Sequence, residues 1–529
     1  MRRCDNLIFR PSGLVRLLLP AMLAVSGTLA LAGCGTEPGP PSVKLGSTVV
    51  NGVHEPHGIA AFLGLPFAEP PVGERRWARP VPWQSDGQSI DASNFAPACM
   101  QTDSGVEWYR GMMARVGIDP NLMVAPEYSE DCLYLNVWTD LEAEEPLPVM
   151  IFIHGGSNKG GWSYEPNYHG EKLARQGMVV VSVAYRLGIF GWLNHPEMAI
   201  KNPALHDLAA SLAWVHEHVA AFGGDPQRIT VVGESAGADN AIHLAISPLS
   251  QGRVRGLIQQ SGGWSFDEGP DTPAAEAHAL AFQQALLGDS GSLAVMREIS
   301  ASELLDAAGA VYSNFYFDPV EDPESLPNTL PMLSESGSLP TIDIIIGTNF
   351  NEAMMYIPSG YTPFEYFGGR LSEALVERIF DDFPTELPVL EQMDRVGTGI
   401  GFLCPSLALA SALDGAGARV WVYRFDRVRP GFEPIGAYHG AELPYMFDQH
   451  DDWLPITEVD RRITKEMVAH WSAFVRRGDP TSESAPLWPQ WRAGDSLMIR
   501  YGDTTTHGAH PDLAFCEGLR SHYLPEATR

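Results

Sequence analysis

The sequence places a serine between glycines in the motif Gly233-Glu234-Ser235-Ala236-Gly237. An apolar run at 229–232 precedes this motif, and a helical pattern at 236–246 follows it. Small residues between a strand and a helix permit a sharp turn that exposes the serine hydroxyl, so Ser235 is a predicted nucleophile for acyl carbon. The Ala236 N–H, at the helix N-terminus, is a predicted donor to the oxyanion that develops. The alternative is a turn whose serine has no chemical role.

A second glycine-rich motif, His154-Gly155-Gly156-Ser157, directly follows the apolar run 149–153. Glycine lets backbone N–H groups come close to a substrate oxygen, and this pattern is typical of the oxyanion loop of esterases. We predict that the N–H groups of Gly156 and Ser157 complete the oxyanion hole with Ala236. The alternative is an ordinary turn at the end of a strand. His154 is expected to be a structural residue of the loop rather than a base.

Several further stretches of the chain are similar to those of one enzyme family. They are 62–73, 129–137, 185–191 and 221–226, the last of which leads into the Ser235 motif. With them, the chain from Gly46 to the C-terminus resembles the type-B carboxylesterases, the group that includes the cholinesterases. The resemblance implies an α/β-hydrolase fold, carboxylesterase activity on a small-molecule ester, and no metal or cofactor.

A nucleophilic serine needs a base, and the base needs an acid that orients it. In this fold the acid follows the serine and the histidine comes last. The family's acid lies in Asn-x-x-Glu-Gly after a strand, which implies Glu352 here, although Ala353 replaces the usual glycine; Asp343 is the alternative. The family's histidine lies in His-Gly-x-Glu-Leu, which implies His439 as the base, with His450 as the nearby rival.

These residues predict a two-step acyl transfer. His439 takes the proton of Ser235 as the hydroxyl attacks the ester, Glu352 orients the imidazole, and water then hydrolyses the acyl-enzyme. The expected substrates are neutral esters of small to medium size. A binding protein that kept the fold is the alternative of another class, and the intact triad argues against it. An amide, carbamate or polyester as the natural substrate stays open, because specificity depends on the pocket walls.

Three positions depart from the family's pattern. Ser157 stands where many relatives have a third glycine, so the loop has to accommodate a side chain. Asp239 stands where small residues are usual, and we expect it to hydrogen-bond a neighbour rather than to act in catalysis. Leu122 falls where cholinesterases have the tryptophan that holds choline, which removes a cation–π platform. The sequence therefore predicts poor use of choline esters, unless the lost ring is replaced by Trp108, Tyr109 or Trp162.

The chain that carries these motifs alternates between strand and helix patterns. The predicted strands, apolar on both faces as buried parallel strands are, lie at 149–153, 179–185, 229–232, 257–258, 342–346 and 420–425. Helical patterns lie at 205–221, 236–246 and 461–477. This alternation predicts a doubly wound sheet with helices on both faces. Together with the resemblance, it implies the α/β-hydrolase fold with a large, mixed, mostly parallel central sheet. The stretch 46–135 is predicted to add an N-terminal antiparallel edge, and 267–339 a helical cover.

Composition supports one domain and limits the partners. Hydrophobic residues make up 45% of the chain, which permits a large core, and no linker divides 44–529, so we predict a single domain there. The formal net charge is −30. That charge opposes binding to the phosphate backbone of nucleic acid, and no basic stripe offsets it.

The first 33 residues have the pattern of an export signal. Arginines precede an apolar run at 17–32 that is too short and too broken for a good membrane-spanning helix. The run ends in Leu31-Ala32-Gly33-Cys34, which resembles the lipobox of bacterial lipoproteins. We predict cleavage before Cys34, lipid on its thiol, and a Pro/Gly-rich tether at 34–43. The protein is then an exported, membrane-anchored lipoprotein, facing the periplasm or on the cell surface. The alternative is an ordinary cleaved signal.

Once Cys4 and Cys34 are set aside, the remaining cysteines are Cys99, Cys132, Cys404 and Cys516. An even set in an exported chain predicts two disulfides, for which three connectivities are possible. None of the four has the Cys-x-x-Cys spacing typical of zinc sites, so no metal site is expected. The family resemblance implies that Cys99 pairs with Cys132, which leaves Cys404 to pair with Cys516.

Overall fold

The structure is a computed structural model that describes residues 39–524, except for 268–271, 289–290, 313–315 and 383–385. The predicted leader at 1–33, Cys34 and the first residues of the predicted tether lie outside the described residues. From Pro40 onward, the described chain groups into a single unit.

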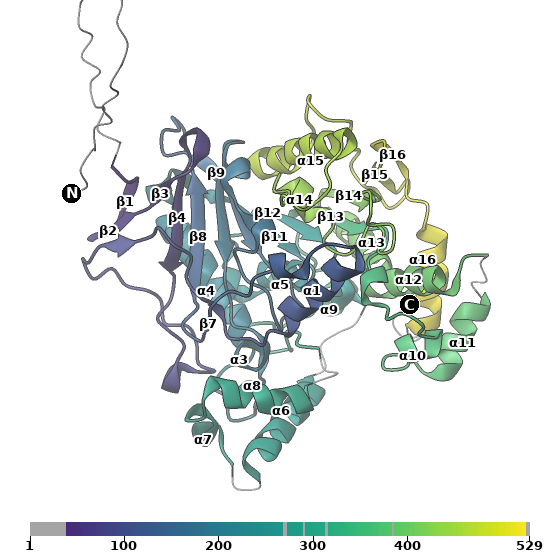
Figure 1. The fold of residues 1–529 in the computed structure, drawn as a ribbon, viewed down its shortest axis with the longest axis horizontal. Helices are drawn as coiled ribbons and strands as arrows, with labels where there is room; N and C mark the ends of the chain where they lie inside the picture. The colour runs from purple at the N-terminus through teal and green to yellow at the C-terminus, as the bar shows by residue number, and fades with distance from the viewer. Residues whose placement is uncertain (1–38, 268–271, 289–290, 313–315, 383–385, 525–529) are drawn as a thin grey trace, which may run out of the picture. The chain divides into compact units, whose positions relative to one another are not determined.

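Within the described chain, the apolar segments found in the sequence form the centre of one sheet (Figure 1). Its parallel strands, in spatial order, are β10 (Val179–Val183), β9 (Leu147–Ile153), β11 (Gly224–Glu234), β12 (Gly256–Gln260), β13 (Asp343–Asn349), β14 (Val420–Phe425) and β15 (Leu497–Tyr501). Each of the six predicted strands overlaps one of them. The sequence did not predict β15, a short strand near the C-terminus.

Antiparallel strands extend this sheet at both edges. Beside β10 lie β8 (Tyr134–Thr139), β4 (Ala60–Pro66) and β3 (Val53–His54), which confirms the predicted N-terminal antiparallel edge. At the other edge, β16 (Thr506–Ala509) pairs antiparallel with β15. The sheet is therefore mixed but mostly parallel, and the fold is the predicted α/β-hydrolase fold.

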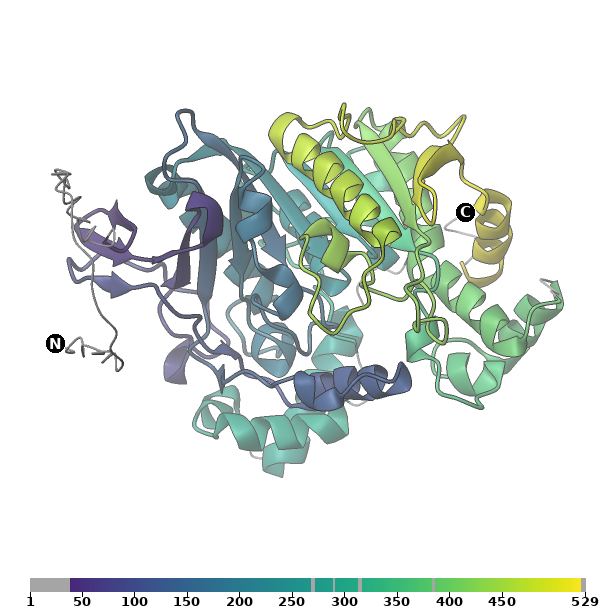
Figure 2. The same cartoon turned by 45° about the horizontal axis from the view of Figure 1, so that its top comes forward.

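Helices cover both faces of the sheet because alternate residues of each strand point to opposite sides. Ile151 of β9 lies in one apolar cluster with residues of α4 (Pro203–His218) and α13 (Cys404–Gly415). Phe152, the next residue, lies in another cluster with residues of α15 (Glu458–Arg477). Figure 2 shows α15 lying along the sheet. These two cores hold the carboxyl ends of the parallel strands in place.

The segments outside the sheet contain more helix than the sequence patterns indicate. The predicted cover at 267–339 contains α6 (Thr272–Leu287), α7 (Leu293–Arg297), α8 (Ala301–Val311) and α9 (Leu330–Glu335). The stretch 46–135, predicted as short strands and loops, also contains α1 (Ser104–Arg115). Only Val106 and Met113 of α1 are buried. A helix with so narrow an apolar face leaves little periodic signal in the sequence.

One helical run among the described residues, Val389–Gly415, is long and apolar enough to cross a membrane by length and composition alone. Of its most apolar window, 72% is buried inside the protein, as in a core helix. The run consists of α12 (Val389–Thr398), a π-helical turn η10 (Gly399–Leu403) and α13. Such turns widen a helix locally and are frequent at functional sites. Phe402, in η10, reaches the site described below.

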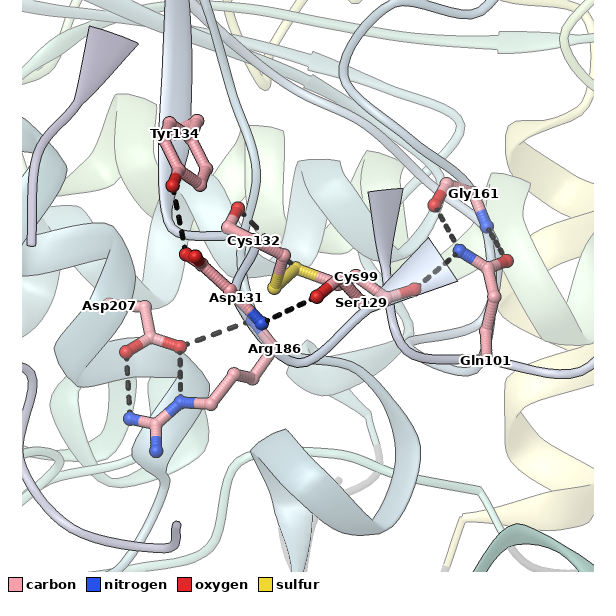
Figure 3. Close-up of a disulfide and its surroundings, with 9 residues drawn as sticks. All are labelled: Cys99, Gln101, Ser129, Asp131, Cys132, Tyr134, Gly161, Arg186 and Asp207. Atoms are coloured by element: carbon pink, nitrogen blue, oxygen red, sulfur yellow. Dashed lines mark hydrogen bonds and ion pairs between the residues drawn. A yellow bond between two sulfur atoms is a disulfide. The ribbon is translucent and has the colours of Figure 1, made fainter. Parts of the chain in front are cut away.

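Two disulfides are present, Cys99–Cys132 and Cys404–Cys516. The first encloses α1, and the second joins α13 to α16 (Leu513–Tyr523). Beside the first disulfide, the amide of Gln101 donates to the Gly161 carbonyl over 2.9 Å and accepts from the Gly161 N–H over 3.0 Å (Figure 3). This clamp fastens the disulfide-closed loop to the chain that follows the His154–Ser157 motif.

Candidate active site

The Ser235 motif forms a tight turn between β11 and α5 (Ala236–Ile246). Ser235 has φ +57° and ψ −130°, a conformation that side chains rarely adopt outside strained, functional turns. The surrounding backbone explains the flanking glycines. A Cβ at Gly233 would lie 2.1 Å from the Gly237 oxygen, and a Cβ at Gly237 would lie 2.1 Å from the Ile153 oxygen. The Ser235 N–H donates to the Gln260 carbonyl over 2.9 Å, which fixes the turn to β12.

The second motif lies against this turn. A Cβ at Gly155 would be 2.9 Å from the Ser235 Cβ, so this loop contacts the predicted nucleophile directly. Gly156 and Ser157 both have positive φ, +105° and +55°, and both are exposed. Within the described chain, the N–H groups of Gly156, Ser157 and Ala236 donate no hydrogen bond. The three predicted oxyanion donors are thus unpaired and lie on the two segments that meet at Ser235.

His154 has the structural role that the sequence predicts. It is buried, its Nδ1 lies 2.8 Å from the Gly155 oxygen, and its ring stacks on Tyr185 with centroids 4.6 Å apart. Burial lowers its pKa to about 4. His154 therefore stays neutral and supports the loop.

His439 and Glu352 form a buried pair. The Nδ1 of His439 lies 2.7 Å from Glu352 Oε2, and the other oxygen of Glu352 accepts the Asn349 N–H over 2.5 Å. Glu352 follows the carboxyl end of β13 and is fully buried. Ala353, which stands where the family has glycine, has room for its methyl group because Gly397 lies opposite. A Cβ at Gly397 would be only 2.8 Å from that of Ala353.

The other imidazole nitrogen of His439 is available. Nε2 is buried, has no hydrogen-bond partner among the described residues, and lies 3.3 Å from Glu234 Oε1. No hydrogen bond joins Ser235 Oγ to His439 within the described chain. In hydrolases without a bound substrate this bond is often long and tightens only in the complex.

The two rival residues lie elsewhere. Asp343 is at the amino end of β13, where its carboxylate binds Arg419 over 2.5 Å. His450 contacts Arg429 through Nδ1 and Thr464 through Nε2. Burial, and then the neighbouring Arg429, lower the pKa of His450 to about 3. Neither rival is bonded to the other members of the predicted triad.

Two buried carboxyl groups near His439 were not assigned a role from the sequence. Glu234 is the second residue of the serine motif, and burial raises its pKa to about 8. Glu442, in the histidine motif, accepts the side-chain amides of Asn349 over 2.6 Å and Gln260 over 2.9 Å. Both glutamates belong to motifs that the sequence singles out, so their position near the site could have been predicted. Their contacts could not, because these depend on how the two motifs pack together.

These carboxyl groups shift the pKa of His439, the predicted base. Burial alone lowers the pKa of His439, but Glu234 and Glu352 outweigh it and raise the pKa above its ordinary value. Because a general base acts when neutral, kcat/KM should rise with pH through this raised pKa. Glu234→Gln removes one carboxylate and should move the acid limb of the pH profile to lower pH, by about one unit.

The measurement is kcat/KM for a neutral ester, from about pH 5 to about pH 10, which spans the titration range of a histidine with a raised pKa. It is made for the wild type and for Glu234→Gln. Asp343→Asn, which removes a carboxylate away from His439, is the matched control. An unchanged limb in Glu234→Gln, or an equal shift in the control, contradicts this assignment.

Aromatic rings line the surroundings of His439. Tyr356, in the short helix η9 (Met354–Tyr356), has its ring centroid 5.7 Å from His439 and stacks on Trp108 of α1 at 5.4 Å. On another side, Phe402 lies 4.9 Å from His439, and Trp264 packs edge-on against Phe402 at 6.1 Å. The walls around the base are therefore apolar and aromatic, which suits alkyl or aryl groups of an ester.

Asp239 bonds a neighbouring segment, as the sequence predicts. It is buried on α5, and its carboxylate accepts the Gly263 N–H over 3.0 Å and the Ser265 hydroxyl. Gly263 precedes the short helix η7 (Trp264–Phe266), so Asp239 fixes the segment that carries Trp264. Burial raises the pKa of Asp239 to about 7.

Leu122 lies at the end of the short helix η3 (Pro120–Leu122), and 52% of its surface is exposed. Of the three aromatic residues named as replacements for the choline-binding ring, Trp108 belongs to the aromatic wall through Tyr356. Tyr109 donates to Glu165 over 3.4 Å, and Trp162 is buried in a small cluster with Ala98 and Val106.

A mostly parallel sheet with helices on both faces, in which a strand, a strained serine and a helix follow one another, defines an α/β-hydrolase. The model of the carboxylesterase family matches residues 40–516. The chain belongs to the carboxylesterase family and is a carboxylic ester hydrolase.

Individual relatives agree with this assignment. The para-nitrobenzyl esterase of Bacillus subtilis (strain 168) is 32% identical over 478 residues, which cover 85% of this chain and 91% of that protein. Human cocaine esterase is 31% identical, covering 82% of each chain. Acetylcholinesterase of Bungarus fasciatus is 28% identical, covering 88% of this chain and 83% of that protein. Among solved structures, a pNB esterase superposes with a TM-score of 0.77 at 30% identity, covering 90% of this chain and 99% of that one.

Proposed function

We propose that the enzyme hydrolyses neutral carboxylic esters of small to medium size by a Ser235–His439–Glu352 triad. The observation that carries the proposal is the 2.7 Å contact between His439 Nδ1 and the buried Glu352, next to a strained serine flanked by unpaired N–H groups. Glu352 holds the tautomer whose Nε2 accepts a proton. In the described chain, His439 Nε2 has no hydrogen-bond partner.

The reaction then proceeds in two steps. His439 takes the Ser235 proton as Oγ attacks the carbonyl carbon, and the N–H groups of Gly156, Ser157 and Ala236 bind the oxyanion. The protonated His439 gives its proton to the departing alcohol. Water, deprotonated by His439, attacks the acyl-enzyme and releases the acid and Ser235. No step needs a metal or a cofactor.

We expect the enzyme to use neutral esters better than choline esters. Leu122 offers no ring face to a quaternary ammonium, and burial raises the pKa of Glu165 to about 7. Glu165 is then only partly ionised near neutral pH and attracts a cation weakly. A missing cation–π contact should cost about tenfold in kcat/KM.

The test compares butyrylcholine with 3,3-dimethylbutyl butyrate, its uncharged analogue of the same shape. Each kcat/KM is divided by the rate of hydroxide-catalysed hydrolysis of the same ester. Failure to hydrolyse either ester contradicts the proposed function. Equal or faster use of butyrylcholine contradicts only the selectivity and implies that Trp108 and Tyr356 form a cation site.

We also propose that Cys34 is the lipidated first residue of a mature lipoprotein, anchored to a bacterial membrane and facing the periplasm or the cell surface. The support is the sequence Leu31-Ala32-Gly33-Cys34 and the Pro/Gly-rich segment after it. Cys34→Ala should abolish lipid attachment, whereas Cys4→Ala, in the leader, should not. Intact-mass spectrometry of membrane-extracted protein provides the measurement, and an unmodified Cys34 thiol in the wild type contradicts the proposal.

A further inference from the structure

A half-buried lysine lies beside the predicted oxyanion loop. The ammonium group of Lys159 is 5.7 Å from the ring centroid of Tyr316 and 5.8 Å from that of Phe317. Burial lowers the pKa of Lys159. Among the described lysines and arginines that are buried or half-buried, it is the only one that forms neither an ion pair nor a side-chain hydrogen bond.

This lysine is held in place by the segment that carries Ser235. Asn158, the preceding residue, accepts a hydrogen bond from Asn240 of α5 over 2.7 Å and donates to the Phe317 carbonyl over 2.6 Å. The Lys159 N–H closes a turn onto the Gly156 carbonyl over 3.0 Å. The position of Lys159 is therefore fixed by the oxyanion loop on one side and by the helix that follows Ser235 on the other.

One of the rings beside Lys159, that of Tyr316, is connected to the surroundings of His439 through Tyr356. After burial, nearby carboxyl groups and Tyr366, Tyr316 also raises the pKa of the Tyr356 phenol, so the two side chains are near enough to interact electrostatically. Tyr356 in turn contacts the His439 ring. Tyr316 is 56% exposed and thus lies at the surface, with Lys159 beside its ring.

A second cationic side chain lies near the Tyr316 ring. The guanidinium of Arg370 lies 4.6 Å from the Tyr316 centroid and has no ion pair within the described chain. This local charge stands against a chain with a net charge of −30. Taking an ammonium group out of water without an acidic partner is unfavourable, and ring faces compensate for it only in part. A ligand that supplies the missing carboxylate would be stabilised there.

We propose that Lys159 binds a carboxylate carried by the substrate, so that the enzyme takes esters with a free carboxylate better than neutral esters of the same size. This inference rests on the proposed ester hydrolysis at Ser235 and adds an anionic subsite to that site. Arg370, which contacts the Tyr316 ring, adds to the attraction.

The carboxylate could belong to the acid or to the alcohol part of the ester, and two matched pairs of substrates distinguish these sources. Mono-(4-nitrophenyl) adipate and 4-nitrophenyl 5-carbamoylpentanoate differ by a carboxylate or an amide on the acyl chain. The esters 4-acetoxybenzoate and 4-acetoxybenzamide differ in the same way on the leaving group. In each pair the ratio of kcat/KM values, corrected for hydroxide-catalysed rates, measures the selectivity for charge.

In the wild type, one of the two ratios should favour the carboxylate by about tenfold, the effect of one charge-assisted hydrogen bond in a half-buried site. Lys159→Gln should reduce that ratio to about one, and Lys159→Arg should keep most of it. Lys465→Gln, which removes an exposed lysine on α15, is the matched control and should change neither rate.

Ratios near one in the wild type overturn the proposal, as does a ratio that Lys159→Gln leaves unchanged, even if both rates fall, because Lys159 would then only support the loop. If the wild type hydrolyses the neutral esters but shows no preference, the subsite is refuted and the ester hydrolase function stands. If it hydrolyses none of the four esters, the proposed function itself fails.

Discussion

Ser235→Ala should lower kcat for ester hydrolysis by a factor of about 10³ or more without unfolding the protein. The serine is the residue that the turn between β11 and α5 presents, and its hydroxyl makes no hydrogen bond within the described chain that the fold would lose. Alanine keeps the backbone N–H that binds the Gln260 carbonyl. The measurement is the rate of p-nitrophenyl acetate hydrolysis, with thermal unfolding followed in parallel.

The matched control is Ser261→Ala, which removes a buried hydroxyl at the end of the neighbouring strand. It should retain most of the activity. Hydrolysis by Ser235→Ala at close to the wild-type rate, with an unchanged melting temperature, would show that another group is the nucleophile.

His439→Ala and Glu352→Gln should each reduce kcat by a factor on the order of 10³. The first removes the base, and the second replaces the carboxylate that holds Nδ1 at 2.7 Å by an amide that stabilises the imidazolium far less. His450→Ala and Asp343→Asn should leave kcat within about threefold, because neither side chain contacts the triad.

The double variant tests whether the residues act as a unit. Ser235→Ala combined with His439→Ala should be about as slow as either single variant, since removal of one member already disables the others. If the two losses multiply, His439 acts in a step that does not involve Ser235, and the assignment of the base is wrong.

The residues of the candidate site were predictable where a short motif carries its own geometry. Ser235 was predicted from the strand, turn and helix around it, whereas Glu352 and His439 were predicted from the resemblance of their surrounding motifs to those of the family. The central strands were predictable because they are apolar on both faces. In each case, the signal lies within about ten residues of the chain.

The walls of the site were not predictable, because their residues are far apart in the sequence. Trp108, Tyr356 and Phe402 come from three distant segments, and their meeting depends on how α1, η9 and the π-helical turn pack on the core. The sequence indicates no helix at α1, so it gives no direction for Trp108. The 3.3 Å approach of Glu234 to His439 likewise depends on two motifs that lie far apart in the chain.

The lack of space around the serine turn determines where this enzyme can evolve new specificities. A methyl group at Gly233, Gly237 or Gly156 would lie 2.1 Å from a backbone oxygen in each case. Substitution at these positions would therefore displace the backbone that holds Ser235 and the oxyanion loop. Lys159 and Leu122, by contrast, face rings or solvent. Mutations that alter the substrate and spare the chemistry are therefore confined to the outer residues, and a combinatorial library should vary those and leave the glycines fixed.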